Sequence, residues 1–182
     1  MRISGGDARG IRLTVPKGAR PASERVRQAV FASIASHLPD ARVLDLYCGS
    51  GAYGLEALSR GATEAVFVDK DLAATKACRT NVCAIGAADS SRIRRTDVLR
   101  YLSRTADKDG PFDLIFIDPP YGDPLDRTLT GIEPALAPEG IVVVETRWRE
   151  GEVFRHPGLV VEADRRYGDT RVLMYVGAKE DV

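Results

Sequence analysis

The feature that most constrains the fold of this 182-residue chain is a regular alternation of short apolar runs and helical patterns after residue 40. Strand candidates lie at 42–47, 64–69, 91–97, 112–118 and 140–145. The apolar ones do not alternate in polarity, which is typical of parallel strands covered on both faces. Predicted helices separate the strands at about 51–60, 71–85, just after 97 and 124–136. This order predicts an α/β fold with a doubly wound, mostly parallel sheet.

The C-terminal part departs from this alternation. Residues 151–156, 158–168 and 169–177 are rich in β-prone residues and are separated only by turns. We expect these segments to complete the sheet in antiparallel fashion.

The N-terminal 40 residues are expected to form a small extension of the main domain, which covers 41–182. A Gly-rich hairpin is predicted first, followed by a helix that begins after Ser23 as its N-cap. The apolar residues of this helix recur every four positions, at Val26, Val30, Ile34 and Leu38.

Charge is unevenly distributed, although the formal net charge is zero. Residues 1–44 contain eight Lys/Arg and three Asp/Glu, so the rest of the chain carries the balancing negative charge. Arginine suits phosphate recognition because its guanidinium fork matches oxyanion geometry. The asymmetry favours an anionic partner for the N-terminal extension, where Arg20, Arg25 and Arg27 lie close together.

The three cysteines, Cys48, Cys78 and Cys83, show neither disulfide nor zinc spacing, which favours a reducing compartment. We expect Cys78 and Cys83 to be buried on one helix, and His37 and His156 to lie at the surface. The first residues lack the apolar core of a signal peptide, and no run is long enough to span a membrane. The sequence predicts a cytoplasmic protein without a metal.

Glycines 49, 51 and 54 follow the first predicted strand in a G-x-G-x-x-G pattern, which indicates an adenosine cofactor but does not identify it. Asp45, just before them, would repel the pyrophosphate of NAD but suits a cationic aminoacyl group. S-adenosylmethionine carries an ammonium and a sulfonium, and is therefore the favoured cofactor. Asp69 ends the second strand, where it could accept bonds from the ribose hydroxyls. Asp97 could bind the adenine amine or serve as a helix N-cap, and the two roles are compatible.

A second motif, Asp118-Pro119-Pro120-Tyr121, follows the predicted strand at 112–118. The Asp118 carboxylate and the Pro119 carbonyl can accept hydrogen bonds from an exocyclic amine, which favours a pyramidal nitrogen with its lone pair available. The prolines stiffen the turn, and Tyr121 offers an aromatic face to a base. This pattern predicts methyl transfer to an amine of a flipped or single-stranded base, with positioning as the main source of rate.

These motifs resemble those of the bacterial 16S rRNA (guanine(966)-N(2))-methyltransferase family, the RsmD-like enzymes among class I S-adenosylmethionine-dependent methyltransferases. The similarity spans nearly the whole chain. It rests on the segments "RISGGDARG", "RPASERVRQAVF", "DLYCGSGAYGLEALSRGA", "DPPY" and "YGDTRVLMY". Cys48 and Tyr53 depart from that family's common residues, Ala and a smaller aliphatic residue.

The resemblance implies a Rossmann-like fold with a seven-stranded sheet, S-adenosylmethionine as cofactor, and the N2 amine of a guanine in small-subunit ribosomal RNA as methyl acceptor. It implies cofactor binding by Asp45, Gly49, Ser50, Gly51, Asp69, Lys70, Asp97 and Val98. The implied catalytic residues are Asp118, Pro119, Pro120 and Tyr121, and the implied RNA contacts are Arg20, Arg25 and Arg27. We expect a monomer that acts on ribosomal RNA or the small subunit and does not bind membranes.

Three alternatives remain open from the residues. An amino-group methyltransferase for another nucleic acid, either DNA adenine-N6 or a different ribosomal RNA base, uses the same chemistry, although the DNA enzyme usually needs a target-recognition domain, for which this chain has little room. A non-catalytic RNA-binding assembly protein would not need Asp118 to Tyr121. An NAD-dependent oxidoreductase would need a proton donor that neither histidine evidently supplies.

Overall fold

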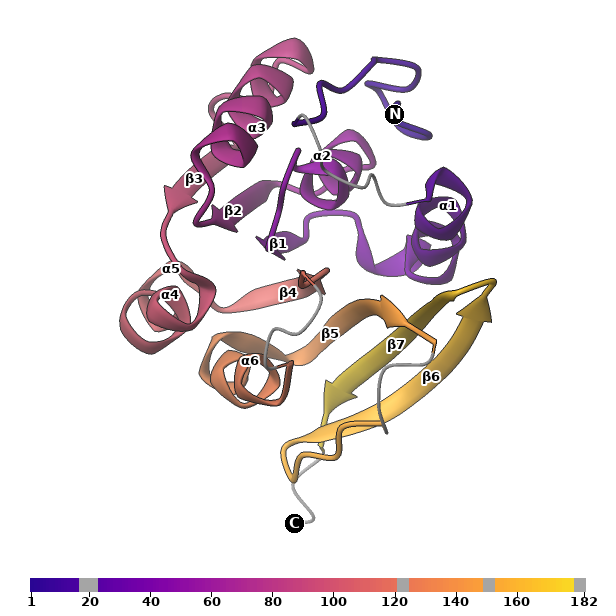
Figure 1. Ribbon diagram of the computed structural model, residues 1–182, viewed down its shortest axis with the longest axis vertical. Coiled ribbons are helices and arrows are strands. Elements are labelled where there is room, and N and C mark those ends of the chain that lie inside the picture. The colour runs from indigo at the N-terminus through magenta and orange to yellow at the C-terminus, as the bar shows by residue number, and fades with distance from the viewer. Residues whose placement is uncertain (17–22, 121–124, 149–152, 179–182) are drawn as a thin grey trace.

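The computed structural model describes residues 1–16, 23–120, 125–148 and 153–178. In this part of the chain, seven strands form one sheet in the order β3-β2-β1-β4-β5-β7-β6 (Figure 1). The strands are β1 Arg42–Leu46, β2 Glu64–Asp69, β3 Ser91–Arg95, β4 Phe112–Ile117, β5 Leu136–Arg147, β6 Leu159–Tyr167 and β7 Thr170–Gly177. Strands β1 to β5 are parallel, and β7 lies antiparallel between β5 and β6.

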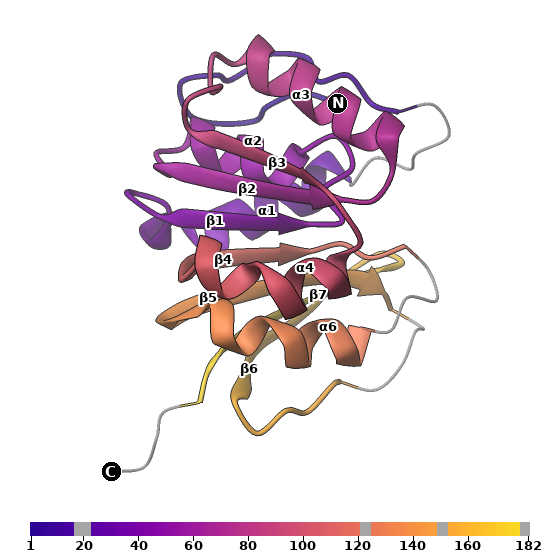
Figure 2. The ribbon, with the colours of Figure 1, turned by 90° about the vertical axis from the view of Figure 1, so that its left-hand side faces the viewer.

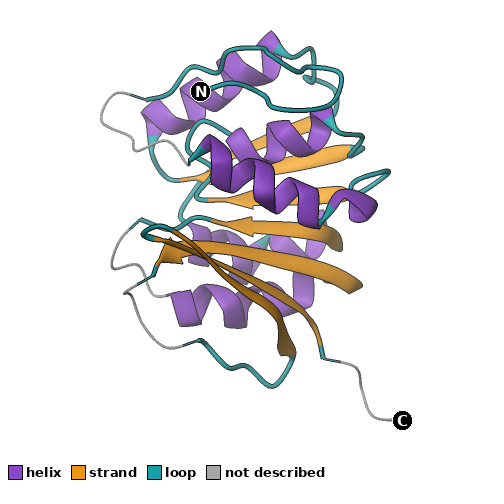
Figure 3. Ribbon diagram, turned by 90° about the vertical axis from the view of Figure 1, so that its right-hand side faces the viewer, coloured by secondary structure: helices purple, strands orange, loops and turns teal. Residues whose placement is uncertain are grey.

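Helices cover both faces of the sheet (Figures 2 and 3). They are α1 Glu24–Ser33, α2 Ala52–Ser59, α3 Leu72–Ala84, α4 Val98–Arg104, α5 Ala106–Asp109 and α6 Leu125–Ile132, with short 3₁₀ turns at Ala35–His37 and Glu133–Ala135. Buried apolar side chains form two clusters, one per face. Helices α1, α2 and α3 contribute to the first, and α4 and α6 to the second. The predicted doubly wound α/β fold is confirmed.

Alternation of side chains along the central strands decides which face each residue meets. In β4, Leu114 and Phe116 belong to the first cluster, whereas Ile115 and Ile117 belong to the second. Both sets are apolar because both faces are covered, which explains the uninterrupted apolar runs in the sequence.

The predicted N-terminal helix is shorter than its periodicity suggested. Helix α1 ends at Ser33, and Ile34 has φ −107° and ψ 16°. A 3₁₀ turn carries the chain onward, so Leu38 is still buried beside the helix without belonging to it. Ser23 occupies the N-cap position, but its side chain makes no capping bond.

Other local predictions also need correction. The N-terminal hairpin is reduced to one bridge between Arg2 and Arg12. In the predicted strand at 151–156, residues 153–155 are not in a strand, and His156 makes only an isolated bridge; residues 151–152 lie outside the described part. A β-prone segment forms a strand only where it finds a pairing partner, and among the described residues no further strand pairs with the sheet edge at β6.

Two side-chain predictions differ from the structure as well. Cys78 is buried but Cys83 is exposed, because five residues rotate a helical side chain by about 140° from its starting direction. His37 is exposed, as predicted, whereas the side chain of His156 is only 15% exposed. His156 stacks on Phe154 and accepts a hydrogen bond from the Gly158 N–H, so its local turn buries it.

Residues 1–16, which we call the N-terminal arm, pack against α2 and α3. Ile3, Ala8 and Leu13 are buried in the first cluster. Ser4 donates to Glu56 through both its N–H (2.9 Å) and its hydroxyl (2.6 Å). Gly6 has φ +75°, and a Cβ there would collide with the Ser59 carbonyl, so the close approach of the arm to α2 requires glycine.

No helix in the described part of the chain combines the length and apolar character needed to cross a bilayer.

Candidate active site

The glycine loop joins β1 to α2 at the carboxyl edge of the sheet. Gly49 has φ +53° and Gly51 φ +79°, left-handed values that glycine adopts without the steric cost of a Cβ. The Gly49 N–H donates to Asp69 at the end of β2 (2.9 Å), and the Ser50 carbonyl accepts from Asn81 of α3 (2.9 Å). The loop is therefore held by both its neighbouring strand and its neighbouring helix.

The three glycines serve different purposes. A Cβ at Gly51 would lie 2.8 Å from the Cys78 sulfur, and one at Gly54 would collide with the ring of Phe67. Both positions must be small so that α2 can pack closely on β2. At Gly49 the nearest atom of the described residues to such a Cβ is the Tyr47 carbonyl oxygen, 4.0 Å away. Unlike the other two glycines, Gly49 is therefore not required by close packing against the described residues.

Asn81 also ties the N-terminal arm to this loop. Its amide donates to the Thr14 carbonyl (2.8 Å) as well as to Ser50, and its oxygen accepts from the Thr14 N–H (2.7 Å). The side chain is 1% exposed. The arm therefore helps to fix the glycine loop in place.

Four carboxyl groups lie at the same edge on the face covered by α1 and α2. Asp45, Asp69, Asp118 and Glu145 come from or directly follow β1, β2, β4 and β5. Each continues the alternation of residues in the first cluster, such as Phe67, Phe116 and Val143 two positions earlier. Because Ile117 pairs with Val144, Asp118 and Glu145 are next to each other in the register. We call this group the acidic edge.

Burial makes the acidic edge unfavourable for several negative charges. It raises the pKa of Asp118 to about 7, with a further contribution from the charge of Glu145. Burial also raises the pKa of Asp45 well above its ordinary value; its bond from the Gly54 N–H (2.9 Å) opposes this rise, and the charges of Asp118 and Asp69 add to it. A cation at this edge would relieve the repulsion.

Tyr53 and Glu145 join α2 to this edge. The Tyr53 hydroxyl donates to Glu145 at 2.5 Å, and the tyrosine ring stacks on Phe116 with centroids 5.0 Å apart. Burial raises the pKa of Glu145, while the Tyr53 bond and the charge of Arg27 lower it. Sequence reasoning assigned neither residue to the site. The signal for Glu145 was its position at the end of a strand, like Asp69, but only the register shows that it adjoins Asp118.

The remaining predicted cofactor residues occupy different environments. Ser50 is buried and Lys70 is exposed. Asp97 is the N-cap of α4, accepting from the Arg100 N–H at 3.1 Å, which confirms one of its two predicted roles. The side chain of Val98 is buried in the second cluster, so only its backbone remains for a ligand.

The catalytic motif is described in part. Asp118 and Pro119 are half-buried and Pro120 is exposed, while Tyr121 lies outside the described residues.

The predicted RNA contact of Arg27 is wrong. Arg27 is 0% exposed; it forms an ion pair with Glu56 (3.3 Å) and donates to the Arg2 carbonyl. Its charge is neutralised inside the protein, because the N-terminal arm and α2 cover the side chain. Arg25 is exposed, and Arg20 lies outside the described residues.

Comparison with known proteins shows the family to which this chain belongs. A family model described as "Conserved hypothetical protein 95" matches residues 1–176. The chain belongs to this family. Two of the segments that carried the resemblance to RsmD-like enzymes meet in the structure, because Arg27 lies in "RPASERVRQAVF" and Glu56 in "DLYCGSGAYGLEALSRGA".

Members of this family and their structures are similar over most of the chain. "Putative rRNA methyltransferase YlbH" of Bacillus subtilis is 34% identical over 181 residues, 96% of this chain and 98% of its own length. "Ribosomal RNA small subunit methyltransferase D" of Escherichia coli is 36% identical over 156 residues, 83% and 77% of the two chains. The structure of "Putative methyltransferase yhhF" from Escherichia coli superposes with a TM-score of 0.88 at 29% identity, covering 99% of each chain. The RsmD-like resemblance and the methyltransferase fold are confirmed.

Proposed function

We propose that this protein transfers a methyl group from S-adenosylmethionine to the N2 amine of a guanine in small-subunit ribosomal RNA. The observation that carries the proposal is the acidic edge beside Gly49, where Asp118 adjoins Glu145. The names of the Bacillus subtilis and Escherichia coli relatives support ribosomal RNA as the substrate. The match of nearly equal length supports the same class of activity in this chain.

The residues at this edge fit a cationic cofactor. In this proposal Asp45 would bind the ammonium group, the Gly49–Gly51 loop would bind the carboxylate, and Asp69 would accept hydrogen bonds from the ribose. Ser50 and Lys70 would border these groups, and Asp97 and the Val98 backbone would bind the adenine. The pyrophosphate of NAD would meet the negative charge of Asp45 and Asp69, which disfavours that cofactor.

S-adenosylmethionine supplies an electrophilic methyl group on a sulfonium. The chain's own task is to bring an amine to it in line and without competing water. Asp118 would accept a hydrogen bond from one N–H of the amine, and the Pro119 carbonyl can accept one from the other. These bonds localise the lone pair on the nitrogen. Asp118 must be ionised to accept, and it can take up the proton that the methylated nitrogen releases, because its pKa is about 7.

Glu145 and Tyr53 hold Asp118 in this role. The negative charge of Glu145 keeps the proton affinity of Asp118 high, and the Tyr53 hydroxyl fixes Glu145. Tyr121 is proposed to stack on the guanine, with Pro120 stiffening the turn.

The test is methyl transfer from labelled S-adenosylmethionine to small-subunit RNA from a strain that lacks this protein, followed by nucleoside analysis. We expect label in N2-methylguanosine at one position. Label in N6-methyladenosine would overturn the guanine assignment. If neither the naked RNA nor the assembled small subunits become labelled, the proposed methyltransferase activity is wrong.

A further inference from the structure

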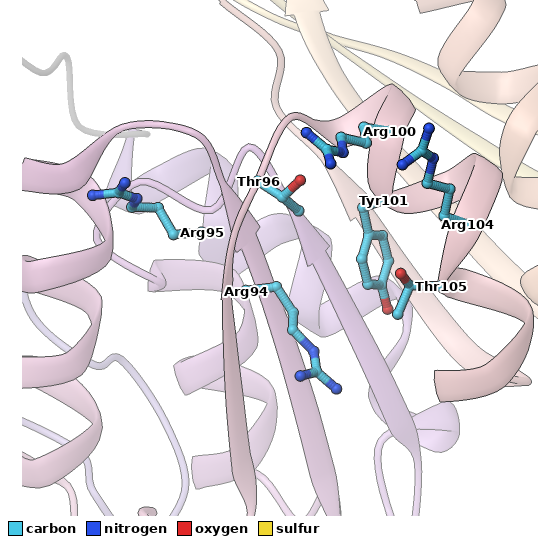
Figure 4. Close-up of a pocket in the computed structure, with 7 residues that line it drawn as sticks. All are labelled: Arg94, Arg95, Thr96, Arg100, Tyr101, Arg104 and Thr105. Carbon is cyan, nitrogen blue, oxygen red and sulfur yellow. The ribbon is translucent and has the colours of Figure 1, made fainter.

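A second charged region lies between β3 and α4, on the face of the sheet opposite to that of the acidic edge. It is a hollow of about 350 Å³. We call it the arginine pocket, and its lining residues are Arg94, Arg95, Thr96, Arg100, Tyr101, Arg104 and Thr105 (Figure 4). No carboxylate is among them, so the pocket suits an anion.

One arginine of the pocket is already neutralised. Arg94 donates to Asp109 at 3.1 and 3.3 Å, and the Tyr101 hydroxyl donates to the same carboxylate at 3.1 Å. Tyr101 is only 1% exposed. These residues form a fixed rear wall that presents no aromatic face on which a base could stack.

Arg100 and Arg104 differ from Arg94 because their charges are uncompensated. Both are exposed, and neither side chain forms a hydrogen bond or ion pair with a residue in the described part of the chain. They are four residues apart on α4, and in Figure 4 both side chains extend from the same helix beside Thr96 and Tyr101. Like charges at this spacing destabilise a helix by about 0.2–0.5 kcal/mol. A bound anion would remove that cost.

The pocket and the acidic edge lie on opposite faces of the sheet, but both extend to its carboxyl edge. Arg95 pairs with Asp69 in the register of β3 and β2, so β3 ends at the edge where the cofactor loop lies. Strand β4, which leads to Asp118, is three positions away in the sheet, or about 14 Å at the usual strand spacing. A nucleic acid with one base at Asp118 can therefore place neighbouring backbone in the pocket.

We propose that the arginine pocket binds phosphodiester groups of the RNA strand that flanks the target base. Arginine forks bind phosphate oxygens in two-point contacts, and the Thr96 and Thr105 hydroxyls add neutral donors. With no exposed aromatic face, the contact is to backbone and independent of base sequence. This inference rests on the proposed function, since it names the surface that holds the same RNA.

The test compares Arg100→Ala/Arg104→Ala with Lys76→Ala/Arg79→Ala. The control pair removes the same charge from exposed positions on α3, a helix of the opposite face. Binding of a small-subunit ribosomal RNA transcript is measured over a range of KCl concentrations. The pocket variant should bind about tenfold more weakly, with a slope of log K against log salt smaller by about 1.4, the value for two lost single-strand phosphate contacts. The control should keep the wild-type slope.

Methyl-transfer kinetics separate this inference from the proposed function. The pocket variant should show a raised KM for RNA, an unchanged kcat and unchanged affinity for S-adenosylmethionine, which also shows that it folds. Equal RNA affinity and equal salt slopes for both variants, with an active wild type, would overturn the pocket assignment alone. A wild type that neither binds nor methylates the RNA would overturn the proposed function.

Discussion

The acidic edge and the arginine pocket lie on opposite faces of the sheet and carry opposite charges in different environments. At the acidic edge, burial raises the pKa values of Asp45, Asp118 and Glu145. In the arginine pocket, Arg100 and Arg104 keep their charges exposed to solvent. The difference indicates two kinds of ligand group. A buried carboxylate interacts strongly with one small cation, whereas exposed arginines attract an extended anion weakly and over a longer range.

Arg27 shows that sequence alone does not separate these cases. It is an arginine like Arg100, yet it is fully buried against Glu56. Its role is to fasten the N-terminal arm to α2, because it binds both Glu56 and the Arg2 carbonyl. The protein therefore contains a buried acidic site, an exposed basic site, and a buried basic group with a structural role.

The largest effect should come from breaking the buried pair. Arg27→Ala leaves Glu56 without one of its partners at a fully buried position, and should lower the free energy of unfolding by about 3–5 kcal/mol. Urea denaturation measures this. Arg25→Ala, an exposed neighbour on the same helix, should change stability by less than about 0.5 kcal/mol. Equal effects of the two changes would mean that the Arg27 pair does not hold the arm.

Removing a charge from the acidic edge should weaken cofactor binding. Asp45→Asn keeps an acceptor for the Gly54 N–H but loses the carboxylate charge, and a charged hydrogen bond contributes about 1.5–3 kcal/mol. We expect S-adenosylmethionine to bind at least about tenfold more weakly in calorimetric titrations. Asp7→Asn makes the same change at an exposed position and should leave the affinity unchanged. An unaffected Asp45→Asn would remove this residue from the cofactor site.

The sequence predicts those parts of the structure that depend on residues close together in the chain. Apolar runs on β1, β2, β4 and β5 and the glycine spacing predicted the sheet and the loop, because each depends on neighbouring residues in the chain. The adjacency of Asp118 and Glu145 depends on the register of two strands far apart in sequence. The burial of Arg27 depends on how the arm closes over α2. Neither leaves a local signal, so sequence reasoning missed the first and misassigned the second.

The pH dependence of stability tests the burial of Asp118. Its pKa is raised to about 7 from the ordinary value of 3.8, so the folded state binds this proton more tightly than the unfolded state. The resulting stabilisation is complete below pH 3.8 and is lost as the pH rises through about 7. Asp118→Asn should therefore gain stability relative to wild type at pH 8, by up to about 4 kcal/mol, and gain little at pH 4. A difference in melting temperature that does not change with pH would contradict this.

The smallest effect should come from Tyr53→Phe, which removes the hydroxyl bond to Glu145 and keeps the ring stacked on Phe116. Losing this hydrogen bond should lower the free energy of unfolding by about 1 kcal/mol. Without that donor the pKa of Glu145 rises, its charge repels Asp118 less, and the rising limb of the pH–rate profile should move to lower pH. The expected loss of kcat is only a few-fold. A profile that keeps its midpoint would show that Glu145 does not act on Asp118.

The most direct test of the account is single-turnover methyl transfer by Asp118→Ala at saturating S-adenosylmethionine, measured together with the Kd of the cofactor. Asp118 is proposed to orient the amine and not to hold the cofactor. The rate should therefore fall by about 100-fold or more, while the Kd stays within about threefold of wild type. Wild-type turnover, or a loss of turnover explained entirely by loss of cofactor binding, would contradict the role given to the acidic edge.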